Sequence, residues 1–279
     1  LQRVPELQES GEGGRSPSMT ARYAVVGNPV THSLSPAIQQ AAFDHVGLDA
    51  RYEAVEVDAA GLSDVFQELR DGRLAGANVT MPHKHRAFQL ADVVEGEARR
   101  AESVNTLVAS GAVIRATSTD IPAVLNVWDQ RELPVGSALI LGSGGAAAAA
   151  LVALEGTGIF LAARASSSAR SLLGRLQIEG EVVPWGTSVP GAVIVNATPL
   201  GMRGETLPTG IISQSAGLFD MAYGSLPTPS IVTARGLGLP AAEGLDMLIE
   251  QAALSFEAWT GQVAPREEMR TAAQIAQGW

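Results

Sequence analysis

The 279-residue sequence contains no cysteine and a single lysine, and both shortages limit its chemistry. Without cysteine, the chain has no disulfide, no thiolate nucleophile and no metal site built on cysteine sulfur. The absence of cysteine does not indicate the cellular compartment of the protein. Every other basic residue among the 19 is arginine, which indicates a compositional bias of the source genome. The lone Lys84 is an exception to that bias and therefore requires a reason.

Positive charge and long apolar runs are also scarce. The formal net charge is −10, so we expect no binding to nucleic acid through a large basic surface. The longest apolar run, residues 146–154, falls far short of the roughly 20 residues that a membrane-spanning helix needs. Only 4 histidines are present, and His83 and His85 have no carboxylate at a suitable spacing, so we expect no metal site.

The first 18 residues are polar and rich in turn formers, and they lack the apolar core of a signal peptide. We therefore expect a soluble, cytoplasmic protein. Because Met19 lies directly before the first strand-like run, we assign residues 1–20 to a disordered or tag-like extension outside the fold.

Short apolar runs alternate with helical patterns along the rest of the chain, and this alternation predicts an α/β fold with a mostly parallel sheet. A second unit begins near residue 120. The expected strands are residues 23–27, 51–57, 76–80, 137–142, 159–163, 192–196 and 218–221, with a hairpin of 104–109 and 112–116; the expected helices are 36–46, 60–70, 87–94, 121–131, an alanine-rich helix after 145 and a helical stripe from 245.

A glycine-rich turn joins the strand at 137–142 to the alanine-rich helix. Gly142, Gly144 and Ala147 fit the dinucleotide fingerprint G-x-G-x-x-G/A, in which the glycines let the backbone approach a pyrophosphate. The alternative is a glycine turn that only packs a helix. Where an NAD enzyme usually carries an acid, this chain has Arg164, which suits the 2′-phosphate of NADP, with Arg170 as a helper.

Lys84 is a candidate acid/base group, because lysine can lose its proton in a protein whereas arginine cannot. Asp120 follows Ser118 and Thr119 where the first unit passes into the second. Alone it would cap a helix, but beside Lys84 it would hold the ammonium and tune its proton affinity.

Ser33 and Ser35 precede a helix that starts near Pro36. The capping preferences predict Ser35 as the N-cap and Pro36 as the first helical residue. The two hydroxyls and the free N–H groups at this helix start also suit a carboxylate, so a structural and a substrate-binding role both stay open.

Eight ordered motifs together resemble the shikimate dehydrogenase family, and the resemblance runs from about residue 23 to residue 261. They are GNPVTHSLSP at 27–36, NVTMPHK at 78–84, SVNT at 103–106, STD at 118–120, GSGGAA at 142–147, NATPLGM at 196–202, DMAY at 220–223 and EGLDMLIEQA at 243–252.

The resemblance implies a two-domain enzyme without a metal. Residues 21–120 would form an α/β substrate domain, completed by C-terminal helices at 245–279, and residues 121–244 a Rossmann-like NADP domain. The family reduces 3-dehydroshikimate to shikimate with NADPH on the route through chorismate to aromatic amino acids. The partners implied are small molecules, with a monomer or homodimer as the assembly.

Carried over by position, the resemblance also implies roles for single residues. The catalytic pair is Lys84 and Asp120; the substrate-binding set is Ser33, Ser35, Asn78, Thr80, Asn105, Tyr223 and Gln251; and the cofactor set is Gly142, Ser143, Gly144, Gly145, Ala146, Arg164, Thr198, Met221 and Gly244.

The sequence departs from the family pattern at several positions. Ser118 stands where asparagine is usual, and Ile121 where glycine follows the aspartate. Residues 163–165 read Ala-Arg-Ala rather than Asn-Arg-Thr, and Ser168 replaces a second arginine. Two alternatives therefore remain: a quinate/shikimate or aminoshikimate dehydrogenase that uses NAD, and a catalytically silent sensor of a shikimate-like ligand.

Overall fold

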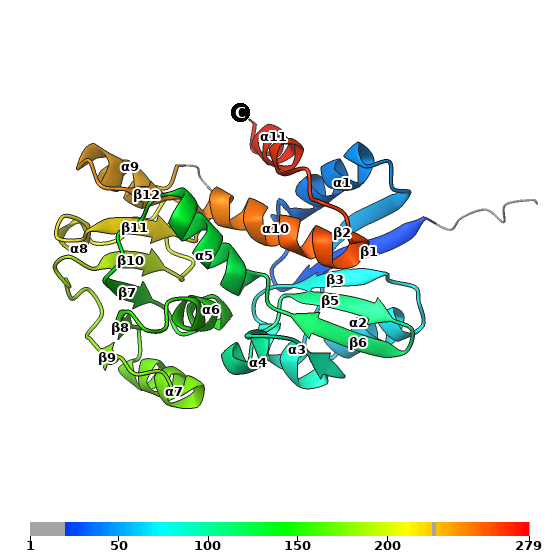
Figure 1. Cartoon of the computed structure of the whole chain (residues 1–279), viewed down its shortest axis with the longest axis horizontal. Helices are drawn as coiled ribbons and strands as arrows, with labels where there is room; N and C mark the ends of the chain where they lie inside the picture. Colours follow the sequence, from blue (N-terminus) through cyan, green and yellow to red (C-terminus); the bar gives the residue numbers. More distant parts are fainter. Residues whose placement is uncertain (1–19, 225–226, 279) are drawn as a thin grey trace, which may run out of the picture.

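The structure is a computed structural model that describes residues 20–224 and 227–278. The extension expected at residues 1–20 lies outside these ranges except for Thr20. Two six-stranded sheets lie side by side, and the long helix α10 (Gly244–Thr260) extends from one to the other (Figure 1).

The first sheet has the strand order β2-β1-β3-β5-β6-β4 and is mixed. β1 pairs in parallel with β2 and β3, whereas β5 pairs antiparallel with β3 and β6. The hairpin expected around the Ser-Gly turn is thereby confirmed. The strands are β1 (Ala21–Gly27), β2 (Ala50–Glu56), β3 (Gly76–Val79), β4 (Val93–Val94), β5 (Thr106–Ser110) and β6 (Val113–Thr117).

Alternate residues of β1 face opposite sides of this sheet, as the period of two in a strand requires. Tyr23 and Val25 pack with α1, α10 and α11, and Ala24 and Val26 pack with α2 and α3. Helices therefore cover both faces. They are α1 (Ser35–His45), α2 (Gly61–Arg70), α3 (Lys84–Leu90), the short α4 (Ala98–Ala101) and α11 (Arg266–Ala276).

The second sheet is parallel throughout, in the order β12-β11-β10-β7-β8-β9. The chain starts at the central β7 and moves first to one side and then to the other, so the order reverses between β7 and β10. Ligands of such sheets bind at the carboxyl ends of the strands at this reversal. The strands are β7 (Ser137–Leu141), β8 (Gly158–Ala162), β9 (Glu181–Val182), β10 (Val193–Asn196), β11 (Gly217–Asp220) and β12 (Ala241–Ala242).

Helices pack on both faces of the parallel sheet, because its strands are apolar on both sides. Ile140 and Val195 face a cluster with α5, α6 and α7, and Leu139 and Ile194 face α8 and α9. These helices are α5 (Asp120–Gln130), α6 (Gly145–Ala153), α7 (Ser166–Leu176), α8 (Thr209–Ile212) and α9 (Pro229–Gly236).

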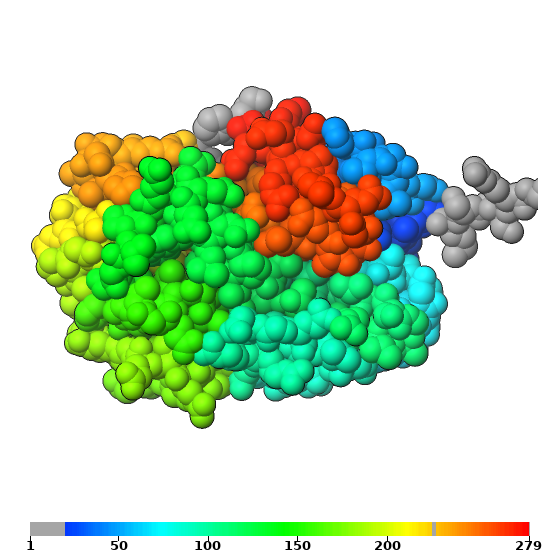
Figure 2. Space-filling view, in the orientation of Figure 1, coloured from blue at the N-terminus to red at the C-terminus, as the bar shows by residue number. Residues whose placement is uncertain are grey.

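Each sheet with its covering helices forms one lobe, so the mixed sheet marks the first lobe and the parallel sheet the second. The chain enters the second lobe through α5 and returns to the first through α10, and these two helices pack against each other. On the face shown in Figure 2, the orange and red C-terminal residues fill the space between the two lobes. In the two ranges that the structure describes, no helix is both long and apolar enough to cross a membrane.

Candidate active site

Lys84 and Asp120 meet where the two lobes join. The Lys84 Nζ lies 2.5 Å from Asp120 Oδ2, and the two side chains are only 18% and 8% exposed. Lys84 is the first residue of α3, which a short loop separates from the end of β3 at Val79, and Asp120 is the first residue of α5. A carboxylate in the first turn of a helix is favoured by the helix dipole. The structure thus pairs the lone lysine with the aspartate, as expected, and Thr119 rather than Asp120 is the residue that precedes the helix.

Asn105 connects this pair to the long helix α10. Its Nδ2 donates to Asp120 Oδ1 at 3.1 Å and to Gln251 Oε1 at 3.2 Å. Its Oδ1 accepts from the Thr119 backbone N–H at 2.8 Å. Because the amide is only 2% exposed, these bonds are shielded from competing water. Asn105 therefore sets the spacing between α5 and α10 next to the ion pair.

The carboxylate-binding candidates Ser33 and Ser35 lie at the start of α1, but the expected capping is wrong. The helix begins at Ser35 itself, and the Ser33 Oγ accepts the Ser35 backbone N–H at 3.2 Å. Sequence spacing alone misplaced the helix start by one residue. Tyr223, from the other lobe, is hydrogen-bonded to the Ser33 side chain. Burial raises the pKa of the Tyr223 phenol, and the nearby negative charge of Asp120 raises it further.

Asn78 is already occupied by protein partners. Its Oδ1 accepts from the Tyr52 hydroxyl at 2.7 Å, and its Nδ2 lies within 3.1 Å of the Asn105 carbonyl, Thr106 Oγ1 and Ser255 Oγ. Asn78 is only 6% exposed, so it supports the neighbouring Asn105 from the interior of the first lobe.

Thr80 lies just after β3, half-buried, with its backbone N–H bonded to the Val26 carbonyl at 2.9 Å. No protein hydrogen bond of its hydroxyl is present within residues 20–224 and 227–278. The Thr80 hydroxyl is therefore available for a ligand, in contrast to the Asn78 amide.

The glycine-rich turn follows β7 and begins α6, as the fingerprint predicted. Gly142 has φ +124°, and a Cβ there would lie 2.8 Å from the Ala197 carbonyl oxygen, so only glycine fits. Around Gly144 there is open space, whereas a Cβ on Gly145 would lie 2.7 Å from Ser103 Oγ and 3.1 Å from Lys84 Cδ. The turn of one lobe therefore touches the lysine of the other.

The cofactor candidates Thr198 and Met221 are held by a buried network at the ends of β10 and β11. Asn196 Oδ1 accepts from the Thr198 hydroxyl at 2.6 Å, and the Met221 N–H donates to the Asn196 carbonyl at 3.1 Å. Asn196 Nδ2 in turn donates to Asp220 at 2.7 Å. Gly244 completes the group, because a Cβ there would overlap the Ala222 carbonyl oxygen.

Arg164 follows β8 and is exposed, as is Arg170 on α7. A hollow of about 340 Å³ is lined by Ser143 and by one face of α7, but not by Arg164 or Arg170. Arg175 at the end of that face is bonded to Glu102 of the first lobe at 2.6 Å. The other lining residues are Ser167, Ser168, Ser171 and Leu172.

Several residues of the site were not singled out from the sequence. Asp220 is fully buried and accepts hydrogen bonds from Asn196, from the Thr228 hydroxyl at 2.6 Å and from the Ala222 N–H. Burial raises its pKa, although these hydrogen bonds partly oppose that shift. Tyr52, Thr106 and Ser255 were also missed. Their only sequence signal is a polar residue within an apolar strand or helix.

The two histidines that flank Lys84 serve the fold. His83 Nε2 lies 2.8 Å from the Val57 carbonyl oxygen, and His85 Nδ1 lies 2.9 Å from that of Glu102. Within the ranges 20–224 and 227–278, no three histidine or acidic side chains gather in a way that could hold a metal ion.

Comparisons with known proteins agree with this geometry. The family model described as "Shikimate dehydrogenase substrate binding domain" matches residues 25–107, and "Shikimate 5'-dehydrogenase C-terminal domain" matches residues 244–274. The chain is 35% identical over 277 residues to the shikimate dehydrogenase (NADP(+)) of Methylobacterium radiotolerans, with 92% of this chain and 98% of the relative covered.

Solved structures give the same result. That of the Thermus thermophilus shikimate 5-dehydrogenase in complex with NADP(H) and shikimate has a TM-score of 0.84 at 33% identity, over 92% of this chain and 99% of that one. A 5-ketofructose reductase of Gluconobacter has a TM-score of 0.82 at 26% identity, over 92% and 98%. With this similarity over nearly the whole length, the chain belongs to the shikimate dehydrogenase family.

Proposed function

We propose that this chain is an NADP-dependent shikimate dehydrogenase, which reversibly reduces 3-dehydroshikimate to shikimate. The observation that carries the proposal is the Lys84–Asp120 pair, 2.5 Å apart and largely buried, with the Lys84 side chain against the glycine turn of the cofactor lobe. An acid/base group placed between the two lobes is what a proton transfer coupled to hydride transfer requires.

In the reducing direction, the substrate carbonyl carbon gains a hydride and its oxygen gains a proton. A bound nicotinamide cofactor supplies the hydride chemistry. The Lys84 ammonium donates the proton to the oxygen, and the resulting amine regains one from solvent. Asp120 holds the ammonium at the reacting oxygen and stabilises its charge, and Asn105 in turn holds Asp120.

The remaining residues of the first lobe orient the ring. Ser33, Ser35 and the Tyr223 hydroxyl form a group of donors for the carboxylate, which the acidic chain must bind through local groups. Thr80, with its available hydroxyl, and Gln251, bonded to Asn105, suit the ring hydroxyls. Asn78 helps to hold Asn105 in place, because the Asn78 amide donates to the Asn105 carbonyl and to the hydroxyls of Thr106 and Ser255.

The second lobe fits a dinucleotide. Gly142 and Gly144 leave backbone accessible at the start of α6, where a pyrophosphate is favoured by N–H groups and the helix dipole. The Ser103 Oγ, next to Gly145, is buried without a hydrogen-bond partner among the described residues, so a polar ligand group there would satisfy it. Arg164 stands at the ribose end and favours the 2′-phosphate of NADP. The cytoplasmic location and the monomeric or dimeric state stay predictions.

A spectrophotometric assay of the purified chain tests the proposal. Shikimate, quinate and the alcohol formed by reduction of 5-ketofructose are each incubated with the protein and either NADP or NAD. The formation of reduced cofactor is followed. We expect the highest kcat/KM for shikimate with NADP. Faster turnover of another pair would replace the proposal with that activity. Shikimate binding by calorimetry without turnover of any pair would identify a sensor.

A further inference from the structure

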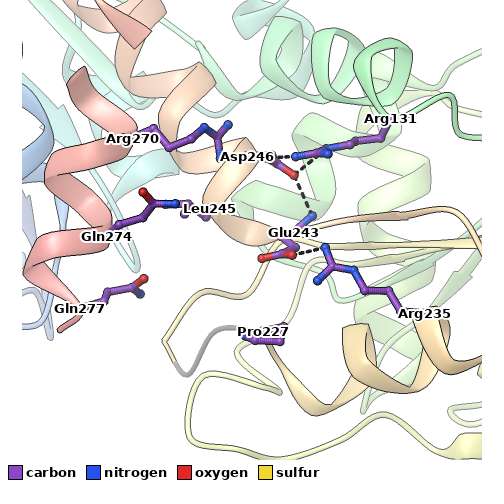
Figure 3. Close-up of a pocket in the computed structure, with 9 residues that line it drawn as sticks. All are labelled: Arg131, Pro227, Arg235, Glu243, Leu245, Asp246, Arg270, Gln274 and Gln277. Carbon is purple, nitrogen blue, oxygen red and sulfur yellow. Dashed lines mark hydrogen bonds and ion pairs between the residues drawn. The ribbon is translucent and has the colours of Figure 1, made fainter. Parts of the chain in front are cut away.

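A single buried carboxylate, that of Asp246, contacts arginines from two further helices (Figure 3). Asp246 lies in the first turn of α10 with its side chain 3% exposed. Its two oxygens accept from Arg131 Nε at 2.9 Å and Arg131 Nη2 at 2.6 Å, a two-pronged contact from the end of α5. Arg270 Nη1 of α11 lies 3.1 Å away, and the Glu243 N–H donates to the same carboxylate at 3.2 Å.

The charged side chains at this junction are paired with one another. Glu243 is paired with Arg235, and Asp246 with Arg131 and Arg270, around a cavity of about 210 Å³. Burial raises the pKa of Asp246, but the hydrogen bonds and charges of the arginines outweigh burial and leave the pKa below its ordinary value. Three arginines meet two carboxylates here and each arginine is paired with one of them, so the contacts are suited to holding the helices together.

Arg131 and Asp246 form one of several polar links between α5 and α10. In the middle of the helices, Asn126 Nδ2 donates to Glu250 Oε1 at 2.8 Å. At the other end, Asn105 bonds to both Asp120 and Gln251. The order of these links shows that the helices are antiparallel, so the start of α5 with its catalytic aspartate faces the later turns of α10.

The start of α10 is equally tied to the cofactor lobe. Gly244 lies so close to the Ala222 carbonyl that no side chain fits, and Ala222 is flanked by Met221 and Tyr223. A slide of α10 along α5 would therefore move these residues relative to Lys84 and Asp120. Since a misplacement of about 1 Å can lower a rate by about 100-fold, the alignment of the two helices has catalytic consequences.

From this geometry we infer that Arg131 is a positioning residue for hydride transfer. Its two parallel hydrogen bonds to Asp246 fix the register of the two helices that connect the lobes, and so set where the cofactor side of the cleft lies relative to the Lys84–Asp120 pair. This inference rests on the proposed dehydrogenase function.

The test compares Arg131→Gln with Arg70→Gln. The control removes a similar arginine contact, from Arg70 Nη2 to both oxygens of Asp92 at 2.9 and 3.0 Å, but that contact lies wholly within the first lobe. For each protein we would measure kcat, the dissociation constants of shikimate and NADP by titration, and the isotope effect with shikimate deuterated at the reacting carbon.

We expect kcat of Arg131→Gln to fall by about 10- to 100-fold with both dissociation constants nearly unchanged, and its isotope effect to equal or exceed that of the unmodified chain. Arg70→Gln should match the unmodified chain in every value. An Arg131→Gln protein with the same kcat as Arg70→Gln overturns the inference while the proposed function stands. Inactivity of the unmodified chain would instead overturn the proposed function and, with it, the inference.

Arg270 still pairs with Asp246 when Arg131 is removed, so the carboxylate keeps a partner and the variant is expected to fold. Should Arg131→Gln not fold, Arg131→Lys applies the same test, because lysine keeps the charge beside Asp246 but cannot form the two parallel bonds.

Discussion

The site residues of the first lobe, the substrate half, and those of the second lobe, the cofactor half, are arranged differently. On the substrate half, Lys84, Asp120 and Asn105 are bonded to one another and shielded from solvent. On the cofactor half, Gly144 is surrounded by open space and Arg164 is exposed. The chemistry therefore depends on a rigid set of side chains, whereas the choice of cofactor depends on a few exposed groups that can change at little structural cost.

The largest effect is expected on the substrate half, at Lys84. Lys84→Arg keeps the positive charge beside Asp120 but removes the group that exchanges a proton, so kcat should fall by about 10²–10⁴-fold. The dissociation constant of shikimate should change much less. Kinetics at pH 7 to 9 under conditions where chemistry limits the rate would measure this.

Arginine is also larger than lysine, so Lys84→Ala with added small amines serves as the control. Partial recovery of kcat by the amines would locate the acid/base function at this position. An arginine variant within about threefold of the unmodified kcat would assign Lys84 to charge alone.

On the cofactor half, Arg164→Ala should act selectively. Loss of a charge-assisted contact of about 1.5–3 kcal/mol corresponds to roughly 10- to 150-fold in KM for NADP, with little change for NAD. Arg73→Ala, which removes an exposed arginine from the other lobe, is the matched control. Equal changes for both cofactors would place the 2′-phosphate elsewhere, for example beside Ser167 and Ser168.

Smaller effects are expected at the carboxylate site. Ser33→Ala and Ser35→Ala should each weaken shikimate binding by about 0.5–1.5 kcal/mol, or roughly 2- to 12-fold, and leave NADP binding unchanged. Only Ser33→Ala should also lower the free energy of unfolding, because the Ser33 hydroxyl and not that of Ser35 accepts the backbone N–H at the helix start. Titration and urea unfolding would separate the two roles; unaltered shikimate binding in both variants would show that the carboxylate is held elsewhere.

The smallest effect concerns pH and the helices between the two halves. Arginine partners outweigh burial and lower the pKa of Asp246 and of Glu250 below the ordinary values of 3.8 and 4.5. Carboxylates with a lowered folded pKa stabilise the protein above their unfolded pKa and lose that contribution as pH falls through the folded value. Below about pH 4.5, stability should therefore drop by at most about 1.4 kcal/mol per pH unit for each group.

Urea unfolding at a series of acidic pH values would measure this slope, and the Asp246→Asn, Glu250→Gln double variant should flatten it. Asp220 on the cofactor half has the opposite sign, because burial raises its pKa and its contribution is lost as pH rises through the folded value. An unchanged slope in the double variant would remove the two carboxylates from the acid response.

The sequence predicted most of the fold because periodicity and glycine turns are local signals. The strand before Gly142, the helix after it and the hairpin near residue 110 lie where the pattern placed them. The lone lysine and the motif around Asp120 also indicated the pair that the structure brings together. Local patterns were insufficient at the start of α1, which begins one residue earlier than expected and where the Ser33 hydroxyl accepts the backbone N–H of Ser35.

Contacts between distant segments were beyond sequence reasoning. Asp246 and Glu250 lie four residues apart beside an apolar stripe, and Arg266 and Arg270 repeat this spacing on the next helix, but only the fold shows that they pair. Asp220 looked like the end of a strand, and its three donors come from segments on both sides of it.

The most direct test of the central claim is the product itself. The purified chain would be incubated with 3-dehydroshikimate and NADPH, and the shikimate formed would be quantified by chromatography against the NADPH consumed. We expect one shikimate for each NADPH, and loss of this turnover in Lys84→Arg. Unchanged 3-dehydroshikimate, or consumption of NADPH without shikimate, would contradict it.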